Sequence, residues 1–512
     1  MNQQLALEIL LSGESAFITG SAGTGKTFLL NQFIRLAKHE GKFVSVTATT
    51  GLAATHIGGT TIHAWSGIGI HDQLPSGFAE HISKGRREII EKTDILIIDE
   101  VSMLHDYRLD MVDEVCRLVR KRVDEPFGGI QVVMSGDFFQ LPPINRPNDR
   151  RQGSFVVNSL AWRELQPTII YLRDQYRQQD DDLQDILESI RRGEVRRHHA
   201  EKLLERIAEV EADDTDMTEL HTTNIDVDRI NQRKLDELYE DAIEYQAVTT
   251  GSANYVENLM RSVLAPELLL LKKGALVMAV RNDPSRKFVN GSIGKVVAFE
   301  PGTEYPIVEF LNGKEVTMTP ESWELRDGDK KRAGFTQIPL RLAWAITVHK
   351  SQGMTLDAAR IDLRRAFVEG MGYVALSRVK NLQNLHLMGI NKMALKISEE
   401  ALSIDELLVV EAEKAAEKFA HLAKQASERD LSAELAKAQK KTGSSSGWAE
   451  KIAKMREIYP NAYKPWLKND DETLKTDFQN GRTVKELSQK LGRHEGSIAM
   501  RLQKHFGEDV AL

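Results

Sequence analysis

A glycine-rich octapeptide near the start of the chain carries the clearest chemistry in the sequence. Residues 20–27 read Gly-Ser-Ala-Gly-Thr-Gly-Lys-Thr, the G-x-x-x-x-G-K-T pattern of a phosphate-binding P-loop. A short apolar run at residues 16–18 precedes it, and apolar residues at helical spacing over 28–34 follow it. The motif therefore sits between a predicted strand and a predicted helix, where backbone N–H groups and the helix N-terminus can hold phosphates.

This loop predicts ATP bound together with Mg²⁺. Lys26 would reach the β- and γ-phosphates, and the Thr27 hydroxyl would be a ligand of Mg²⁺. The residues expected to surround the phosphates are Gly20, Ser21, Ala22, Gly23, Thr24, Gly25, Lys26 and Thr27.

Two carboxylates end a second apolar run, which covers residues 94–98 and reads as a buried parallel strand. Ligands of open α/β sheets bind beyond the carboxyl ends of such strands. Asp99 is therefore expected to hold Mg²⁺ through water, and Glu100 to orient and deprotonate the attacking water. The alternative is that both residues only cap the following helix.

A third apolar run, residues 130–137, also reads as a core strand. It leads into Gln140, which could sense the γ-phosphate by a hydrogen bond, and then into Pro142-Pro143, which stiffen the loop. The alternative is an ordinary turn.

The order of these and later motifs resembles that of superfamily 1 DNA helicases of the Pif type, which are related to RecD. The resemblance covers about residues 1–395. Its further motifs are T-A-T-T-G-L-A-A (47–54), G-G-T-T-I-H (58–63), Q-Y-R-Q (175–178), T-V-H-K-S-Q-G (347–353) and Y-V-A-L-S-R (373–378). The segment 106–117 follows the family signature only loosely, so the subfamily, Pif-like or RecD-like, stays open.

The resemblance implies roles for matching positions. Gln4 falls where the family reads adenine, and Gly353 belongs to a motif at the nucleotide. Arg177 and Arg378 match arginine fingers, which stabilise charge developing on the γ-phosphoryl group. The residues expected to act in hydrolysis are Lys26, Asp99, Glu100, Gln140, Arg177 and Arg378.

Single-stranded DNA needs groups for its phosphates and flat or polar groups for its bases. The candidates at predicted strand ends and loop starts are Thr49, Thr50, His63, His349, Lys350 and Ser351. For His63 the alternative is a buried structural histidine. Residues 71–85, which include Phe78, are either a wedge that splits the duplex or a plain surface loop.

These motifs need an α/β scaffold with two RecA-like domains, of which only the first carries a P-loop. We expect the first domain at residues 1–165, with a small insertion near 56–90, and the second at 166–270 and 338–400. Short strands and Asn-Gly turns predict an SH3-like β insertion at 271–337. An Ala/Glu/Lys-rich helical spacer and a Ser/Gly linker are expected at 401–447.

Residues 448–512 predict a small all-α domain with helix-turn-helix spacing. Thr483 and Glu486 form a capping-box pattern at one of its helices. Arg493 and Arg501 could face duplex DNA. The alternative is a protein-docking unit, because the basic excess is slight.

The composition of the chain limits the class of protein and its compartment. The chain has 512 residues, 41% of them hydrophobic, one cysteine and a net charge of −7. It contains no apolar run near the ~20 residues that span a membrane. The lone cysteine favours a reducing cytoplasm, and residues 1–19, which lack Lys and Arg, show no secretory or mitochondrial leader pattern. Because the motor motifs begin almost at residue 1, we expect a bacterial cytoplasmic protein associated with the nucleoid. Global charge does not exclude a locally basic groove.

The sequence thus predicts an ATP-dependent DNA helicase that moves on single-stranded DNA, 5′ to 3′ by resemblance. It would unwind duplex or structured DNA in replication, repair or recombination. One rival is a DNA-dependent ATPase that displaces proteins without unwinding. Another is a P-loop switch that uses its C-terminal domain in transcription, which the two arginine motifs disfavour.

Overall fold

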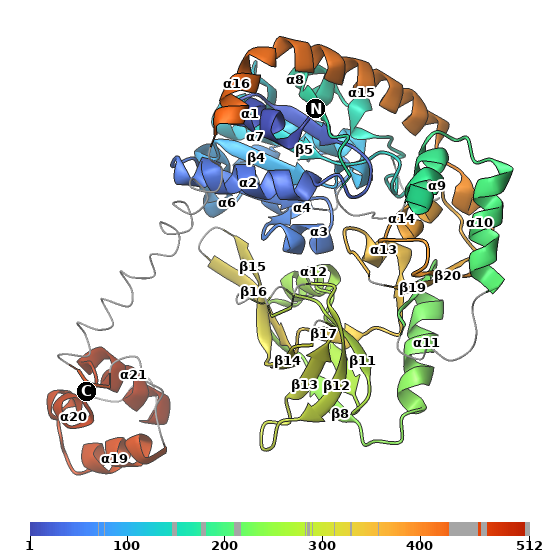
Figure 1. Ribbon diagram of the computed structural model, residues 1–512. Helices are drawn as coiled ribbons and strands as arrows, with labels where there is room; N and C mark the ends of the chain where they lie inside the picture. Colours follow the sequence, from blue (N-terminus) through green and yellow to red (C-terminus); the bar gives the residue numbers. More distant parts are fainter. Residues whose placement is uncertain are drawn as a thin grey trace. The chain divides into compact units, whose positions relative to one another are not determined.

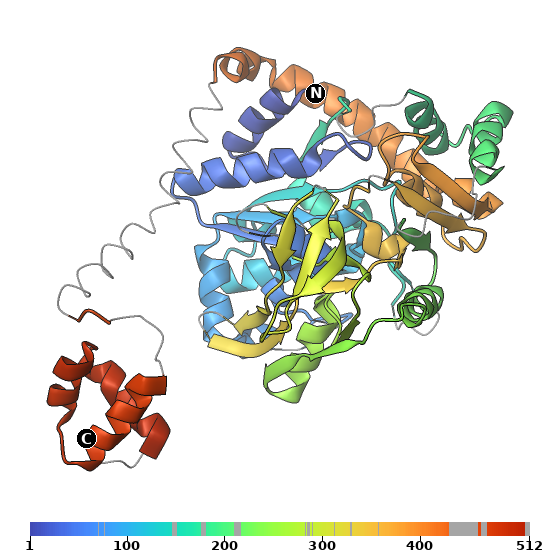
Figure 2. The ribbon, with the colours of Figure 1, turned by 60° about the horizontal axis from the view of Figure 1, so that its bottom comes forward.

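The computed structural model describes residues 1–69, 71–75, 77–145, 151–175, 181–208, 217–281, 283, 287–288, 290–311, 313–327, 330–356, 358–429, 459–461 and 468–506. The chain divides into two compact units, Met1–Arg429 and Asp430–Leu512. Figure 1 shows the elements of each unit along the chain, and Figure 2 shows the same elements from another side. No helix among the described residues is both long and apolar enough to cross a membrane.

A six-stranded parallel sheet forms the first part of the larger unit. Its order is β3 (Thr60–Thr61), β2 (Val44–Ala48), β4 (Ile95–Asp99), β5 (Gln131–Ser135), β1 (Ala16–Thr19) and β6 (Thr168–Tyr171). Every residue of β4 is buried, as expected for a strand covered on both faces. β6 lies beyond residue 165 yet pairs in parallel with β1, so the first sheet runs past the predicted boundary.

Helices accompany this sheet in two groups. α1 (Gln3–Leu11) packs against α2 (Lys26–His39), whereas α7 (Asp106–Arg120) packs with α4 (Ile62–Ser66), α6 (Lys84–Lys92) and α8 (Leu160–Leu165). The short helices are α3 (Gly51–His56) and α5 (Phe78–His81). Cys116, on α7, is fully buried, and burial raises the pKa of its thiol, which confirms a packing residue.

A second parallel sheet has the order β18 (Ala345–Thr347), β7 (Glu219–His221), β19 (Ala359–Leu363) and β20 (Leu385–Ile390). Its helices are α9 (Asp181–Arg191), α10 (Arg197–Ala208), α11 (Asn224–Asp236), α13 (Val348–Ser351) and α14 (Met371–Leu376). Two parallel sheets in one unit are what two RecA-like domains require.

Antiparallel strands lie between the chain segments of the second sheet. A five-stranded sheet has the order β14 (Glu315–Thr317), β13 (Pro306–Phe310), β12 (Ile293–Phe299), β11 (Leu276–Ala279) and β17 (Leu340–Leu342). Two small sheets join β15 (Glu321–Asp327), β16 (Lys330–Gln337) and β9 (Val248–Gly251), and β10 (Leu268–Leu271) with β8 (Ile243–Gln246). α12 (Ala253–Ser262) packs on the first of these.

The antiparallel region is therefore longer than the predicted 271–337, because it runs from β8 to β17. The pairing of β9 with β16 joins residues about eighty positions apart. Local alternation of apolar residues cannot reveal such a pairing.

The predicted spacer is wrong for its first part, because α15 (Glu399–Lys418) and α16 (Ala423–Glu428) are packed helices. α15 lies against β6. α16 lies against α1 (Figure 1). The buried stripe of α15 consists of Ala401, Ile404, Leu408, Ala412 and Ala415. The alanines of this stripe let the helix lie close to the sheet. In the sequence the same alanines, mixed with Glu and Lys, are typical of a solvated helix.

The smaller unit contains α19 (Lys468–Gln479), α20 (Val484–Leu491) and α21 (Glu495–Phe506). Its core consists of Leu474, Leu487, Leu491, Ile498 and Leu502. The capping box of Thr483 and Glu486 is present at α20, and Gly492 ends that helix with φ of 59°.

Candidate nucleotide and DNA site

The P-loop lies between β1 and α2, as the sequence predicts. Gly20, Gly23 and Gly25 have φ of 144°, 94° and 84°. A Cβ on Gly20 would stand 2.4 Å from the carbonyl oxygen of Leu172, so this turn requires glycine. Lys26 Nζ donates to Gly20 O at 2.8 Å and to Ser21 O at 3.1 Å, which places the ammonium over the loop.

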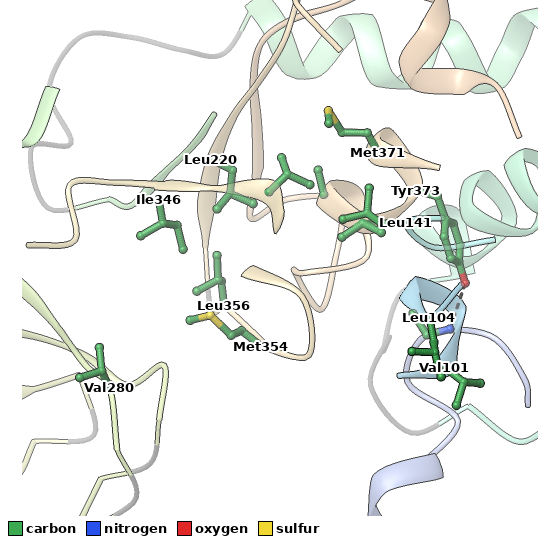
Figure 3. Packing of buried hydrophobic residues seen from close by; sticks show 14 of the residues in the cluster. Val101, Leu104, Leu141, Leu220, Val280, Ile346, Met354, Leu356, Met371 and Tyr373 are labelled. Carbon is green, nitrogen blue, oxygen red and sulfur yellow. Dashed lines mark hydrogen bonds between the residues drawn. The ribbon is translucent and has the colours of Figure 1, made fainter. Parts of the chain in front are cut away.

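Three side chains from other segments contact this loop. Gln3 Nε2 donates to Thr24 O at 3.2 Å, and Gln175 Nε2 donates to the hydroxyl of Ser21 at 2.5 Å. The backbone N–H of Ala22 donates to the hydroxyl of Tyr373 at 2.9 Å. Figure 3 shows Tyr373 reaching from α14 toward the first sheet.

The prediction for Gln4 needs correction. Gln4 is exposed on α1, and its neighbour Gln3 is the residue whose side chain contacts the P-loop. The two glutamines are adjacent in sequence. The orientation of the first turn of α1 determines which of their side chains faces the P-loop.

The two carboxylates follow β4 directly and lie side by side. Asp99 is 6% exposed, and its Oδ1 accepts from the backbone N–H of Glu100 at 3.0 Å. Burial raises the pKa of both groups, and the neighbouring charge of Asp99 helps to raise that of Glu100 to about 7. A carboxylate with a pKa near neutrality suits a general base.

The same residues fit a divalent cation. The raised pKa values of the buried Asp99 and the half-buried Glu100 mean that both carboxylates gain from a further positive charge, in addition to the nearby Lys26 and Arg378. Thr27 is exposed in the first turn of α2, and hard oxygen donors of this kind suit Mg²⁺. Thr27 and Asp99 are therefore suitable holders for Mg²⁺.

Gln140 lies in the loop after β5 and is 6% exposed. Its Nε2 donates to Asp137 Oδ2 at 3.3 Å. Its buried Oε1 accepts no hydrogen bond from the described residues. Buried polar atoms usually have partners, so an unsatisfied one in a loop beside a P-loop is suited to a ligand.

The second sheet contributes to the same site through α13. Gln352 Nε2 donates to Glu100 Oε2 at 3.1 Å, and the charge of Arg378 also lowers the pKa of Glu100. Arg378 is 1% exposed, and its guanidinium donates to Val374 O at 2.8 Å, to Ser351 O at 3.3 Å and to Met354 O at 3.2 Å. Gly353 is exposed with φ of 78°, and Arg177 lies outside the described residues.

The predicted DNA contacts divide into two groups. Thr49 donates its hydroxyl to Glu100 O at 2.8 Å, and Ser351 is fully buried and donates to Val348 O at 2.8 Å. Both side chains are committed to the protein, which corrects their assignment as DNA contacts. Thr50 is half-buried and accepts from Ala53 N at 3.2 Å.

The half-buried His63, His349 and Lys350 remain candidates for DNA contact. Burial and the charges of Arg108 and His105 lower the pKa of His63 to about 4, so its ring is neutral at physiological pH. Burial also lowers the pKa values of His349 and Lys350.

An exposed aromatic beside this group was missed by the sequence analysis. Phe367 is 61% exposed, and its ring is stacked on His349 with centroids 6.3 Å apart and an interplanar angle of 21°. Phe367 lies eighteen residues after His349 in the sequence and outside its motif, so motif spacing gives no signal for it. Exposed aromatic faces of this kind stack with bases of single strands.

The segment 71–85 is anchored at several points. Arg108 Nη2 donates to Asp72 Oδ1 at 3.2 Å, and Leu74 and Phe78 pack against the core. This favours the plain surface segment over a projecting wedge for Phe78, whose side chain is half-buried.

The arginines predicted to face DNA in the smaller unit are used in its own packing. Arg493 is 3% exposed and donates to Asp470 Oδ2 at 3.0 Å and to Asn461 O at 3.1 Å. Arg501 Nε donates to Asp471 Oδ1 at 2.7 Å. Hydrogen bonds from Arg501 and His505 lower the pKa of Asp471. Sequence alone cannot show that acidic residues on α19 face these arginines.

The missed contacts of Gln175, Gln352 and Tyr373 all lie inside recognised motifs. Each stands next to, or within a few residues of, a position that the resemblance assigns. The sequence therefore marked the right segments but not the side chains that join them.

Comparisons with known proteins agree with this geometry. The family model described as PIF1-like helicase matches residues 3–202. "ATP-dependent DNA helicase Pif1" of Psychrobacter sp. (strain PRwf-1) is 38% identical over 464 residues, which cover 79% of this chain and 70% of that protein. The Xenopus laevis "ATP-dependent DNA helicase PIF1" is 39% identical, with 75% of this chain and 60% of that protein covered.

Solved structures give the same result. The crystal structure of Pif1 helicase from Candida albicans has a TM-score of 0.69 at 34% identity, covering 80% of this chain and 99% of that one. Pif1 helicase from Bacteroides in complex with ADP-AlF3 and ssDNA has a TM-score of 0.60 at 32% identity, covering 79% and 96%. Two parallel sheets, a P-loop with its paired carboxylates and these similarities show that the chain belongs to the PIF1-like helicase family.

Proposed function

We propose that this chain is an ATP-dependent DNA helicase that translocates on single-stranded DNA from 5′ to 3′ and unwinds duplex or forked DNA. The observation that carries the proposal is the hydrogen bond between Gln352 and Glu100. It joins the residue expected to activate water to the segment that also holds His349 and Lys350. A change at the DNA side of α13 therefore reaches the hydrolytic carboxylate directly.

The proposed chemistry follows from the positions of the side chains. Glu100 accepts a proton from the attacking water, which its pKa of about 7 permits at physiological pH. Lys26, Gln140 and the arginines Arg177 and Arg378 stabilise the charge that develops on the γ-phosphoryl group. Mg²⁺, when bound by Thr27 and Asp99, supplies further positive charge at the phosphates.

Movement requires that ATP favours one arrangement of the two sheets over another. A ligand shifts such an equilibrium only through contacts that differ between the two states. Gln140 belongs to the first sheet and Arg378 to the second, so a γ-phosphate contacted by both supplies that difference. Hydrolysis removes the contact and lets the sheets separate.

The two sheets support a division of roles between domains. The first sheet with α1–α8 would form the ATP-binding motor domain, and the second sheet its partner. The antiparallel region would be the SH3-like insertion. We infer a cytoplasmic setting with nucleoid DNA as the substrate, and a protein or duplex-DNA partner for the smaller unit.

Support for DNA as the partner comes from the Bacteroides Pif1 helicase that was crystallised with ADP-AlF3 and ssDNA. The test is strand separation on partial duplexes with a 5′ or a 3′ single-stranded tail, with ATP and Mg²⁺. Unwinding of the 5′-tailed duplex alone, lost in Lys26→Ala, is the expected result. ATP hydrolysis stimulated by DNA without unwinding of either duplex would favour the rival, a translocase that displaces proteins.

A further inference from the structure

We propose that Arg191 is a positioning residue for ATP hydrolysis. It fixes the positions of the P-loop and of the loop that carries Gln140 relative to the second sheet. The proposal rests on the proposed function and adds a residue outside the motifs that the resemblance assigns. Arg191 is the last residue of α9, and the proposal assigns it no contact with the nucleotide. It would act through Asp137 and Tyr373.

The guanidinium of Arg191 is the centre of a buried polar network. The residue is 8% exposed, and its Nη1 donates to Asp137 Oδ1 at 2.7 Å and to the hydroxyl of Tyr373 at 3.2 Å. Its Nη2 donates to the hydroxyl of Tyr171 at 3.1 Å. The guanidinium plane also lies over the ring of Phe139, 4.1 Å from the centroid. Four side chains thus fix one cation.

One branch of the network leads to the γ-phosphate sensor. Asp137 is fully buried, and its Oδ2 accepts from Gln140 Nε2 at 3.3 Å. Burial alone would raise the pKa of Asp137, but Arg191 and Lys26 outweigh it, so the carboxylate stays charged. Without Arg191 a buried charge would lose its closest partner, and the loop that carries Gln140 would have to rearrange.

A second branch leads to the P-loop. The hydroxyl of Tyr373 accepts from Ala22 N at 2.9 Å and donates to Asp137 Oδ2 at 3.4 Å (Figure 3 shows this tyrosine). Gly370 is the N-cap of the same helix, and a Cβ there would stand 2.7 Å from the carbonyl oxygens of Phe139 and Gln140. The start of α14 is therefore in close contact with the sensor loop, and Arg191 ties both to the P-loop.

A third branch reaches α15. The hydroxyl of Tyr171 donates to Asp405 Oδ1 at 3.0 Å, and Asp405 Oδ1 lies 3.7 Å from Arg191 Nη2. Asp405 thus completes a chain of groups from the P-loop to the helix that covers β6. The network joins the first sheet, the second sheet and α15 at one side chain, so its loss should affect hydrolysis more than nucleotide binding.

The test uses Arg191→Lys, which keeps the charge but loses the planar fork, and Tyr373→Phe, which removes only a hydroxyl. We expect each full-length variant to lower the kcat of DNA-stimulated ATP hydrolysis by about 10- to 100-fold. The KM for ATP should stay within about threefold of wild type, because neither residue is proposed to contact the nucleotide. The double variant should lower kcat no further than the worse single variant, because both changes break one network.

The matched control is Arg192→Ala. Arg192 is adjacent, its side chain is 68% exposed, and it pairs with Glu188 at 3.2 Å, so the variant should retain wild-type kcat. If folded Arg191→Lys and Tyr373→Phe proteins kept kcat within about twofold of wild type, or if their effects simply multiplied in the double variant, the proposal would be overturned. A wild-type protein that hydrolysed no ATP with DNA would overturn the proposed function instead.

Discussion

Gln352 donates a hydrogen bond from its side-chain amide to Glu100 Oε2 at 3.1 Å, and this contact joins the second sheet to the hydrolytic carboxylate of the first. The amide stabilises the ionised form of Glu100 and so opposes the burial that raises its pKa. The position of α13 therefore sets how easily Glu100 accepts a proton.

Replacing Gln352 by alanine should move the acid limb of the pH–rate profile to higher pH. Glu100 acts as a base only when ionised, and its pKa is about 7 with the hydrogen bond in place. Loss of the bond raises that pKa, so hydrolysis at pH 7 falls while hydrolysis at high pH recovers. The measurement is kcat/KM for ATP between about pH 5.5 and 9. The exposed Gln383→Ala is the control, and an unmoved limb in Gln352→Ala would contradict the assignment of Glu100.

Glu100→Gln should abolish hydrolysis yet stabilise the fold at alkaline pH. The folded pKa of Glu100 lies above its ordinary value of 4.5, so the folded state loses stability as pH rises from about 4.5 through about 7. A neutral amide avoids this loss, which amounts to at most about 3 kcal/mol. The measurement is the Tm of wild type and variant at about pH 5 and about pH 8. The variant should have the higher Tm only at the higher pH. A Tm difference that does not depend on pH would argue against a Glu100 whose ionised form is destabilised by burial.

Phe367→Ala should weaken binding of single-stranded DNA by about 5- to 100-fold, the range of one lost base stack. Stacking releases no counterions, so the dependence of affinity on salt should keep its slope. Lys350→Ala should instead reduce that slope by roughly 0.7, as expected for one lost phosphate contact. Fluorescence anisotropy of a labelled oligonucleotide at several salt concentrations separates the two effects. Phe43→Ala, another exposed aromatic, serves as the control.

Leu408→Ala and Leu407→Ala form a matched pair on α15. Leu408 is 6% exposed and Leu407 is 69% exposed. The first substitution should lower the free energy of unfolding by about 2–5 kcal/mol, and the second by less than about 0.5 kcal/mol. Denaturant unfolding of the full chain measures both. Equal effects would show that α15 is a solvated spacer after all.

Arg493→Ala should loosen the smaller unit without a direct effect on DNA contact. The change removes the guanidinium that lies 3.0 Å from Asp470, and breaking a largely buried ion pair of this kind is costly. Limited proteolysis of the full chain should show faster cleavage within residues 468–506, while Arg482→Ala, which removes an exposed side chain, should not. Loss of salt-dependent duplex binding with unchanged proteolysis would restore the DNA-facing role.

The chemistry of the first sheet was predictable because it is local in sequence. The P-loop, Asp99 and Glu100 each stand at the end of an apolar strand, and parallel strands bring such ends to one edge. The capping box at Thr483 was predictable for the same reason.

The contacts that the sequence could not give join distant segments. Whether Thr49 faces DNA or Glu100, and whether Gln3 or Gln4 turns toward the P-loop, depends on tertiary packing. The packing of α15 could not be predicted because alanines favour a helix whether it is buried or exposed. These alanines are buried because α15 lies against β6. The prediction that Arg493 faces DNA was wrong for a related reason. In the sequence, a basic residue near a turn has the same appearance whether it faces DNA or an acidic residue such as Asp470.

The burial of Cys116 makes the chain suitable for site-directed labelling. It is the single cysteine of the sequence, and α7 holds it in the core, where its thiol is protonated and shielded from reagents. Cysteines introduced at exposed Lys38 on α2 and Gln232 on α11 would then be the thiols that maleimide dyes reach. Energy transfer between these dyes would follow the separation of the two sheets through each turnover, without any need to remove a native cysteine.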